Sequence, residues 1–176
     1  LGGNTIISVS IGQGEILATP LQIANLSALI ANRGYFYTPH VVKAIQDTTL
    51  PKEFTTRRVP HIDKKHYDVV AEGMRMAVTG GTCRTANLPG LNVCGKTGTA
   101  ENRGQDHSVF MGFAPMNEPK IAVAVYVENG GYGAVYGVPI GGLIMEQYLN
   151  GELSETSKLK ADAMQQRTIN YGKQER

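Results

Sequence analysis

The sequence has 176 residues, of which 41% are hydrophobic and 18% charged, a composition that suits a buried core and excludes an intrinsically disordered chain. Its net charge of +2 is too small to indicate a nucleic-acid or anionic-membrane partner. No apolar run approaches the ~18–20 residues that span a bilayer, and because the sequence begins with leucine we interpret it as a piece of a longer protein.

The first predicted element of regular structure is a helix over residues 19–33. Residues 1–17 are punctuated by glycine and are expected to form a loop with a short extended piece. Thr19 is a suitable N-cap, Pro20 occupies the first helical position, and Gln22 completes a T-x-x-Q capping box. Apolar residues surround most of the helix, so we expect it to be largely buried.

The middle of the chain combines irregular structure with a second helix. Gly34 is a stop signal for the first helix. Residues 35–45 include a β-like patch, and residues 47–65 are polar and indicate a surface excursion or small hairpin. A helical pattern over residues 66–79 ends at a pair of glycines, and its predicted apolar side consists of Val69, Val70, Met74, Ala77 and Val78.

The last third predicts three strands and a helix. The strands cover residues 91–100, 108–114 and 121–127, and their short connections favour antiparallel pairing, because a parallel crossover needs a dozen residues or more. A glycine-rich loop precedes a helix over 143–149, and the sequence is polar from Glu152 onward, where we expect a loosely held tail. The fold class is therefore α/β of the α+β type, with an antiparallel sheet flanked by helices.

The most informative motif is the run Lys96-Thr97-Gly98-Thr99 within the first predicted strand. Strand alternation places Thr97 and Thr99 on one side, and Gly98 lets a ligand lie close to the backbone. Two hydroxyls and an ammonium suit a carboxylate, and a free Thr99 N–H suits an oxyanion. Taken by itself, the run is equally compatible with an ordinary strand that bears a surface lysine.

Two further patterns match active-site motifs in letters but not in context. Gly90 to Thr97 fit the P-loop pattern G-x-x-x-x-G-K-[ST], yet a strand is predicted where a phosphate-binding helix would have to start. Ser157 and Lys160 fit S-x-x-K, the nucleophile motif of serine acyl-transfer enzymes, but they lie in the polar tail, where a lysine stays solvated and protonated.

Four segments resemble the class B penicillin-binding proteins, in the same order and with similar spacing. They are SIGQGEILATPLQIANLSALIANRG at 10–34, GKTGTAE at 95–101, DHSVFMGFAP at 106–115 and PKIAVAVYVENGGYG at 119–133. The resemblance covers about residues 1–150 and is greatest to penicillin-binding protein 2, the cell-elongation group. It implies a partial penicillin-binding/transpeptidase fold of the β-lactamase-like type.

The resemblance also implies roles for the Lys-Thr-Gly-Thr run at the edge of an active site. Thr97 and Thr99 would hydrogen-bond the carboxylate of a β-lactam or of the donor peptide's terminal D-alanine, beside Gly98. The Thr99 N–H would share the oxyanion hole with that of the nucleophilic serine. Lys96 would be the catalytic residue of this chain, paired electrostatically with the serine of an S-x-N motif.

Neither the nucleophile nor an S-x-N motif is found in a credible position. The resemblance therefore implies that residues 1–151 are the C-terminal portion of a transpeptidase domain without its nucleophile-bearing half, and that 152–176 are a polar C-terminal tail. The parent would be a peptidoglycan D,D-transpeptidase that cross-links stem peptides through a serine acyl-enzyme and binds β-lactams. The chain alone is expected to be inactive.

The resemblance implies no cofactor, metal or nucleic acid. The implied partners are peptidoglycan stem peptides, β-lactams, the upstream half of the domain and the cell-elongation machinery. The implied location is the periplasmic face of the bacterial inner membrane, with an anchor outside this chain. The alternatives are a D,D-carboxypeptidase, a class D β-lactamase or a β-lactam sensor, or a noncatalytic cell-wall scaffold module.

The remaining candidates have simpler interpretations. Cys83 and Cys94 match no metal or redox pattern; two buried thiols are the simplest interpretation, and a disulfide remains open. Glu101 and Asn102 are compatible with a cleft rim or with turn chemistry. Arg84 is a candidate to face the cleft.

The histidines give no firm site either. His107 begins the second strand, where a hydrogen-bonded structural histidine is more common than a catalytic base. His61, Asp63 and His66 have a weak metal-ligand spacing in a segment predicted to be an exposed loop.

Overall fold

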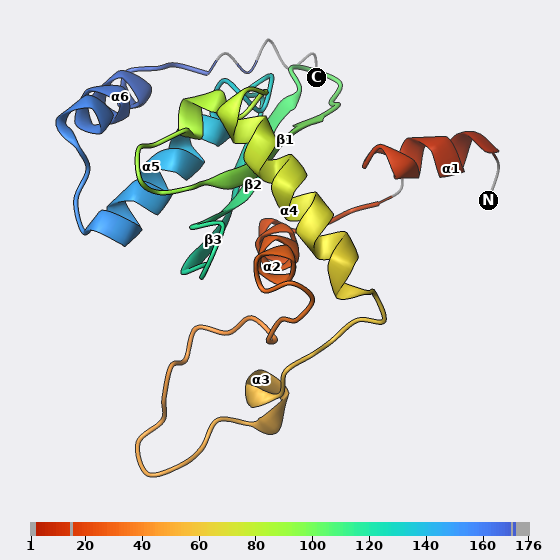
Figure 1. The fold of residues 1–176 in the computed structure, drawn as a ribbon. Coiled ribbons are helices and arrows are strands. Elements are labelled where there is room, and N and C mark those ends of the chain that lie inside the picture. Colours follow the sequence, from red (N-terminus) through yellow and green to blue (C-terminus); the bar gives the residue numbers. More distant parts are fainter. Residues whose placement is uncertain (1–2, 15, 170, 172–176) are drawn as a thin grey trace.

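A computed structural model describes residues 3–14, 16–169 and 171 of the chain. Its helices surround a small sheet (Figure 1). Their bounds are α1 Gly3–Ser10, α2 Pro20–Ala31, α3 Lys52–Thr55, α4 Lys64–Thr79, the 3-10 turn η1 Arg84–Ala86, α5 Gly137–Asn150 and α6 Glu155–Gln165.

The sheet is antiparallel and has the order β1-β2-β3, which confirms the predicted pairing. Its strands are β1 Cys94–Ala100, β2 His107–Ala114 and β3 Ile121–Val127. The first strand begins later than predicted, at Cys94, because the chain approaches it through a turn whose apolar residues are nevertheless buried. β1 is an edge strand among the described residues, so one side of its backbone is not paired with another strand.

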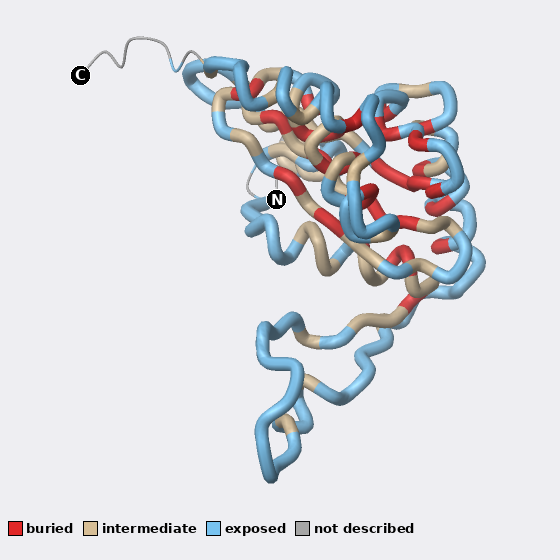
Figure 2. The backbone as a smooth tube through the Cα atoms, turned by 90° about the vertical axis from the view of Figure 1, so that its left-hand side faces the viewer, coloured by how far each residue is buried: buried red, intermediate tan, exposed pale blue. Residues whose placement is uncertain are grey.

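Helices cover both faces of the sheet, and each face has its own core. Helices α2 and α4 pack against one face and α5 against the other (Figure 1). Phe113 of β2 belongs to the α2–α4 core, and Phe110, three residues earlier, belongs to the α5 core. Figure 2 shows the buried residues concentrated in this layered body. The α+β class is therefore confirmed.

The capping box predicted for α2 is present. The Thr19 hydroxyl accepts from the Gln22 N–H, and the Gln22 side chain accepts from the Thr19 N–H. At the other end Arg33 has a φ of 57° and its N–H donates to the Ile30 carbonyl, while the Gly34 N–H donates to the Leu29 carbonyl. The helix thus ends in a Schellman motif with Arg33, not Gly34, at the left-handed position.

The expectation that α2 is largely buried is wrong. Leu21 is 61% exposed and Leu26 48% exposed. Only the side of the helix that faces the sheet and α4 is covered, and its fully buried members are Ser27, Ile30 and Ala31. The described part of the chain supplies no element to cover the opposite side.

Helix α5 begins at Gly137 rather than at residue 143, because its first turns need glycine to approach the sheet. A Cβ on Gly141 would lie 2.4 Å from the Phe110 ring, and one on Gly137 would lie 3.0 Å from the Phe110 backbone. Glycines in this segment therefore allow close packing of helix on strand. Sequence reasoning treated the same glycines as a loop.

The two ends of the chain are more helical than predicted. Residues 3–10 form α1 instead of a loop, because glycine occurs only at the first residue of this helix and again after its end. Residues 1, 2 and 15 lie outside the described part. The expectation of a loose tail is wrong for residues 155–165, which form α6 against α5.

Residues 35–62 form a lobe that extends from the body, as Figure 2 shows by its mostly exposed backbone. The predicted β-like patch is reduced to isolated bridges, of which Phe36 with Arg58 closes the base of the lobe. The surface excursion predicted for 47–65 is confirmed, with the short helix α3 in place of a hairpin.

The side of helix α4 that is buried differs from the predicted one. Val69 is 68% exposed and Val70 45% exposed, whereas Tyr67 and Ala71 are buried beside the predicted Met74 and Val78. The sequence contains two overlapping apolar stripes, and contact with β1 and α2 selects one of them.

Replacing Gly73 of α4 with alanine is expected to stabilise the chain by about 0.5–1 kcal/mol. A Cβ at this exposed helical position meets no atom within 4 Å. Urea unfolding measures the change. Gly131→Ala is the matched control: its Cβ also meets nothing, but its φ of +69° disfavours an L-residue, so destabilisation is expected there. Destabilisation by Gly73→Ala would contradict the prediction.

Glu146 of α5 attaches α6 to the body. Its Oε1 accepts from the Ser154 N–H at 3.2 Å, and its buried Oε2 lies near Ser157 without a well-formed hydrogen bond to any described residue. Burial acts to raise the pKa of Glu146, but interactions with Ser157 and Ser154 and the charge of Lys160 outweigh it, so the pKa is lowered from 4.5.

This lowered pKa predicts an acid-sensitive attachment of α6. The stabilising contribution of Glu146 is fully present above pH 4.5 and is lost as the pH falls through the lower folded-state pKa. We expect amide exchange in α6 to accelerate below pH 4.5 relative to α5. In Glu146→Gln that acid-dependent step should vanish, and its persistence in the variant would contradict the assignment.

Candidate functional site

The edge strand β1 brings the predicted site residues together. Thr97 lies opposite Phe110 and therefore points to the α5 face of the sheet, together with Thr99. Lys96 and Gly98 belong to the opposite face. Because β1 is an edge strand, residues of both faces border the same open side.

The backbone of β1 offers polar groups along this open edge. The Thr97 carbonyl accepts from Lys96 Nζ at 2.8 Å, and the Thr99 carbonyl accepts from Gln13 Nε2 at 3.0 Å. In an antiparallel strand the N–H and C=O of one residue point the same way. The Thr99 N–H is therefore directed toward the open edge, as a donor for an anionic ligand requires.

Two segments distant in sequence hold the threonine hydroxyls of β1. Thr82 Oγ1 lies 3.0 Å from Thr97 Oγ1, and the Gly133 N–H donates to Thr99 Oγ1 at 3.5 Å. A Cβ on Gly133 would lie 2.5 Å from the carbonyl oxygens of Gly98 and of the β2 residue opposite it. Only glycine permits this approach, so the loop at Gly133 is fitted to the strand.

A cavity of about 430 Å³ borders β1 and the segment that follows α1. Lys96 to Thr99 line it together with Gln13, and most of its other lining residues are apolar. Lys96 is exposed and belongs to no ion pair among the described residues. Among the described residues that line the cavity none is acidic, and this part of the lining suits an anionic ligand with apolar parts.

Comparison with known proteins agrees with this geometry. The family described as "Penicillin binding protein transpeptidase domain" matches residues 3–146. The chain belongs to the penicillin-binding protein transpeptidase family. The match includes the β1 run, the segment around Gln13 and the loop at Gly133.

Similar members of this transpeptidase family include a peptidoglycan enzyme and a solved PBP2 structure. The chain is 38% identical over 149 residues to the peptidoglycan D,D-transpeptidase MrdA of Acinetobacter baumannii, covering 72% of this chain and 22% of MrdA. A crystal structure of Pseudomonas aeruginosa PBP2 in complex with WCK 5153 is similar with a TM-score of 0.72 and 38% identity, covering 86% of this chain and 34% of that one.

A third relative has been solved as an acyl-enzyme. Penicillin-binding protein A of M. tuberculosis, in its penicillin G acyl-enzyme complex, has a TM-score of 0.67 and 31% identity, covering 81% of this chain and 34% of that one. The resemblance to class B enzymes and to the PBP2 group is confirmed. The chain spans about a fifth to a third of the length of these relatives.

The other motifs do not form the sites that their letters indicate. Lys96 and Thr97 are in a strand, so the P-loop alternative lacks its helix. Ser157 and Lys160 are on α6, and Ser157 is buried rather than solvated. Arg84 is in η1 and lines a cavity beside α5 and α6 instead of the one beside Lys96.

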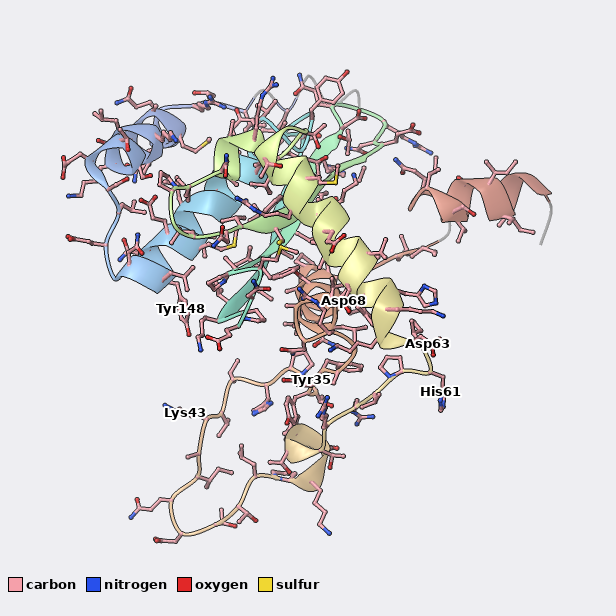
Figure 3. The ribbon with its side chains drawn as sticks, viewed as in Figure 1. Tyr35, Lys43, His61, Asp63, Asp68 and Tyr148 are labelled. Carbon is pink, nitrogen blue, oxygen red and sulfur yellow. The ribbon has the colours of Figure 1, made fainter. Side chains whose placement is uncertain are left out.

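The histidines and their neighbours have structural surroundings. His107 Nδ1 accepts from the Asn129 N–H at 3.0 Å, as expected for a structural histidine. Asn102 accepts from the next backbone N–H, which is turn chemistry. His61 and Asp63 lie before α4 (Figure 3), His66 is in its first turn, and no group of described residues there or elsewhere is arranged to hold a metal ion.

The two cysteines are free thiols in different cores. Cys83 is buried on the α5 side and Cys94 on the α2–α4 side, so they form no disulfide. Burial raises the pKa of both thiols, that of Cys94 to about 11 in spite of Arg75. Both are therefore protonated and weakly nucleophilic at neutral pH.

Sequence reasoning missed three residues that support the family's edge strand. Gln13, Thr82 and Gly133 contact β1 from segments up to 86 residues away. Gln13 is flanked by glycines within the segment that resembles the family, and this was its available sequence signal. Thr82 had no such signal, because its role arises from the packing of α4 and η1 against β1.

Proposed function

We propose that this chain is part of a peptidoglycan D,D-transpeptidase domain and contributes the edge strand of its active site. The observation that carries the proposal is the open edge of β1, where the Lys96 ammonium and the Thr99 N–H lie at the border of a largely apolar cavity. The names of the similar proteins support the reaction class.

In the proposed reaction a serine of the upstream half attacks the substrate carbonyl. The Thr99 N–H donates to the oxyanion that develops, and Lys96 keeps the site positive for the anionic peptide or β-lactam. The Thr97 and Thr99 hydroxyls hydrogen-bond the substrate carboxylate, and Gly98 leaves room above the strand. Thr82 and Gly133 hold those hydroxyls in position.

The proposal assigns the nucleophile to a segment outside this chain. It is supported by the fraction of the relatives that the chain spans, 22% of MrdA and 34% of the PBP2 structure. Under this proposal residues 1–151 are the C-terminal portion of the domain and 152–176 follow it as a polar extension. Stem peptides and β-lactams are the proposed ligands.

We also propose a location and partners that follow from the same function. The enzyme would act at the periplasmic face of the inner membrane with the cell-elongation machinery. A similar protein, 34% identical, was solved in a study titled "Structural coordination of polymerization and crosslinking by a peptidoglycan synthase complex". Among the described residues, no helix is both long and apolar enough to cross a membrane.

Fluorescent penicillin tests the proposal. The chain alone should not be labelled, whereas the chain mixed with the upstream half of its domain should be labelled covalently on that half. Unlabelled penicillin G added first should block the signal. Absence of labelling with both halves folded and associated would overturn the proposal, as would labelling of the isolated chain.

A further inference from the structure

A second cavity lies between η1, α5 and α6, away from the groove beside Lys96. Its volume is about 450 Å³, within the range of small-molecule sites. Figure 1 shows α6 alongside α5 at this end of the molecule. One wall is apolar and includes Leu88, Val135, Leu143 and Met164.

Among the described residues, the charged ones that line this cavity are all cations. They are Arg84, Lys160 and Arg167. The Glu146 carboxylate is close to the lining residue Ser157 and accepts a hydrogen bond from the Ser154 N–H before α6. Its negative charge therefore offsets one of the three positive charges. The local balance is still positive, which disfavours a cation or a purely apolar occupant.

The arginines are placed for ligand recognition rather than for structure alone. The Arg84 side chain has no hydrogen bond or ion pair among the described residues. Arg167 is fixed by a 3.0 Å bond from Nη1 to the Val135 carbonyl and by the Tyr136 ring 5.5 Å away. A guanidinium has five N–H donors, so most of those on Arg167 remain unused.

We propose that this cavity binds a small organic anion, a phosphate ester or carboxylate that carries an apolar group. The guanidinium groups of Arg84 and Arg167 can each present two N–H donors to two oxygens of such an anion, and Lys160 adds charge. The apolar group lies against Leu143 and Met164. No residue assigned to the transpeptidase site takes part.

The cavity is coupled to the transpeptidase site through its own walls. Arg84 is two residues from Thr82, which contacts Thr97, and Ala134 in the lining follows Gly133, which donates to Thr99. An occupant therefore restrains both segments that hold the threonine hydroxyls. This coupling, unlike the binding itself, rests on the proposed function.

Binding is tested by methyl NMR of the full chain joined to its upstream half. Phenyl phosphate should produce a saturable shift of the Met164 methyl signal, inorganic phosphate should bind more weakly, and benzyl alcohol should not bind. Arg84→Gln should weaken the binding of phenyl phosphate about tenfold, because one charge-assisted contact is lost. Lys43→Gln, on the remote lobe (Figure 3), should leave it unchanged.

Three results would overturn the binding proposal: shifts that do not saturate, equal binding of benzyl alcohol, or unchanged affinity in Arg84→Gln with a native spectrum elsewhere. The coupling is tested separately with fluorescent penicillin. Phenyl phosphate should change the acylation rate of the parent enzyme in a saturable way, and in Arg84→Gln the same change should require about tenfold more phenyl phosphate. An identical rate with and without phenyl phosphate would overturn the coupling. A failure of acylation under all conditions would count against the proposed function instead.

Discussion

Replacing Lys96 with alanine is expected to lower the rate of acylation by fluorescent penicillin about a hundredfold in the reassembled domain. This is the size of effect typical when one group that provides electrostatic stabilisation in an active site is removed. Lys96 is exposed, forms no ion pair among the described residues and bonds only the carbonyl of its neighbour Thr97. Its charge is therefore free to act on a ligand at the open edge of β1.

Because Lys96 lies on the surface of the strand, the alanine variant separates an effect on acylation from an effect on stability. Lys96 lies outside both buried clusters, so the alanine variant should keep the urea midpoint of the wild type. Lys96→Arg should retain part of the rate, because charge is kept but the compact ammonium is lost. Lys65→Ala, at another exposed lysine in the first turn of α4, should acylate normally. Wild-type acylation in Lys96→Ala would remove this residue from the proposed site.

The fold was predictable where local chemistry determines it. The α2 capping box needs only Thr19 and Gln22, and the three strands follow from alternating or continuous apolar runs between turns. The start of α5 was not predictable, because the glycines at 137 and 141 serve contact with Phe110 on another element. The prediction of the buried side of α4 was wrong for the same reason, because tertiary contacts decide which of its two apolar stripes is buried.

The strand that carries the candidate site was predictable from the sequence, but the residues that surround and support it were not. The residue types of Lys96 to Thr99 and their alternation are compatible with an anion-binding strand, and the resemblance of the surrounding segments favoured that interpretation. Their supports come from contacts over 15, 34 and 86 residues of sequence separation, which no local pattern encodes. The cavity beside α6 was not predictable for another reason. The polar composition of the C-terminal segment indicated a loose tail and not a helix packed against α5.

Replacing Arg33 with alanine is expected to destabilise the chain by about 3 kcal/mol. Its Nη1 donates to the carbonyls of Ile30 and Ala31 at 3.2 and 2.8 Å, and its Nη2 donates to the Met116 carbonyl at 3.1 Å. The side chain, 17% exposed, joins the end of α2 to the turn after β2. Alanine removes the guanidinium donors from these carbonyls, although that of Ile30 still accepts from the backbone N–H of residue 33, and it keeps the unfavourable backbone conformation.

Two further variants separate the contributions at this position. Arg33→Gly should be about 1 kcal/mol less destabilising than Arg33→Ala, because glycine adopts a φ of 57° without strain. Asp68→Ala removes only the 2.9 Å ion pair, whose acidic partner is 51% exposed, and should change the free energy of unfolding by less than about 1 kcal/mol. Urea unfolding gives all three values. An Asp68→Ala loss as large as that of Arg33→Ala would show that the ion pair, and not the three carbonyl contacts, holds α2 against the sheet and α4.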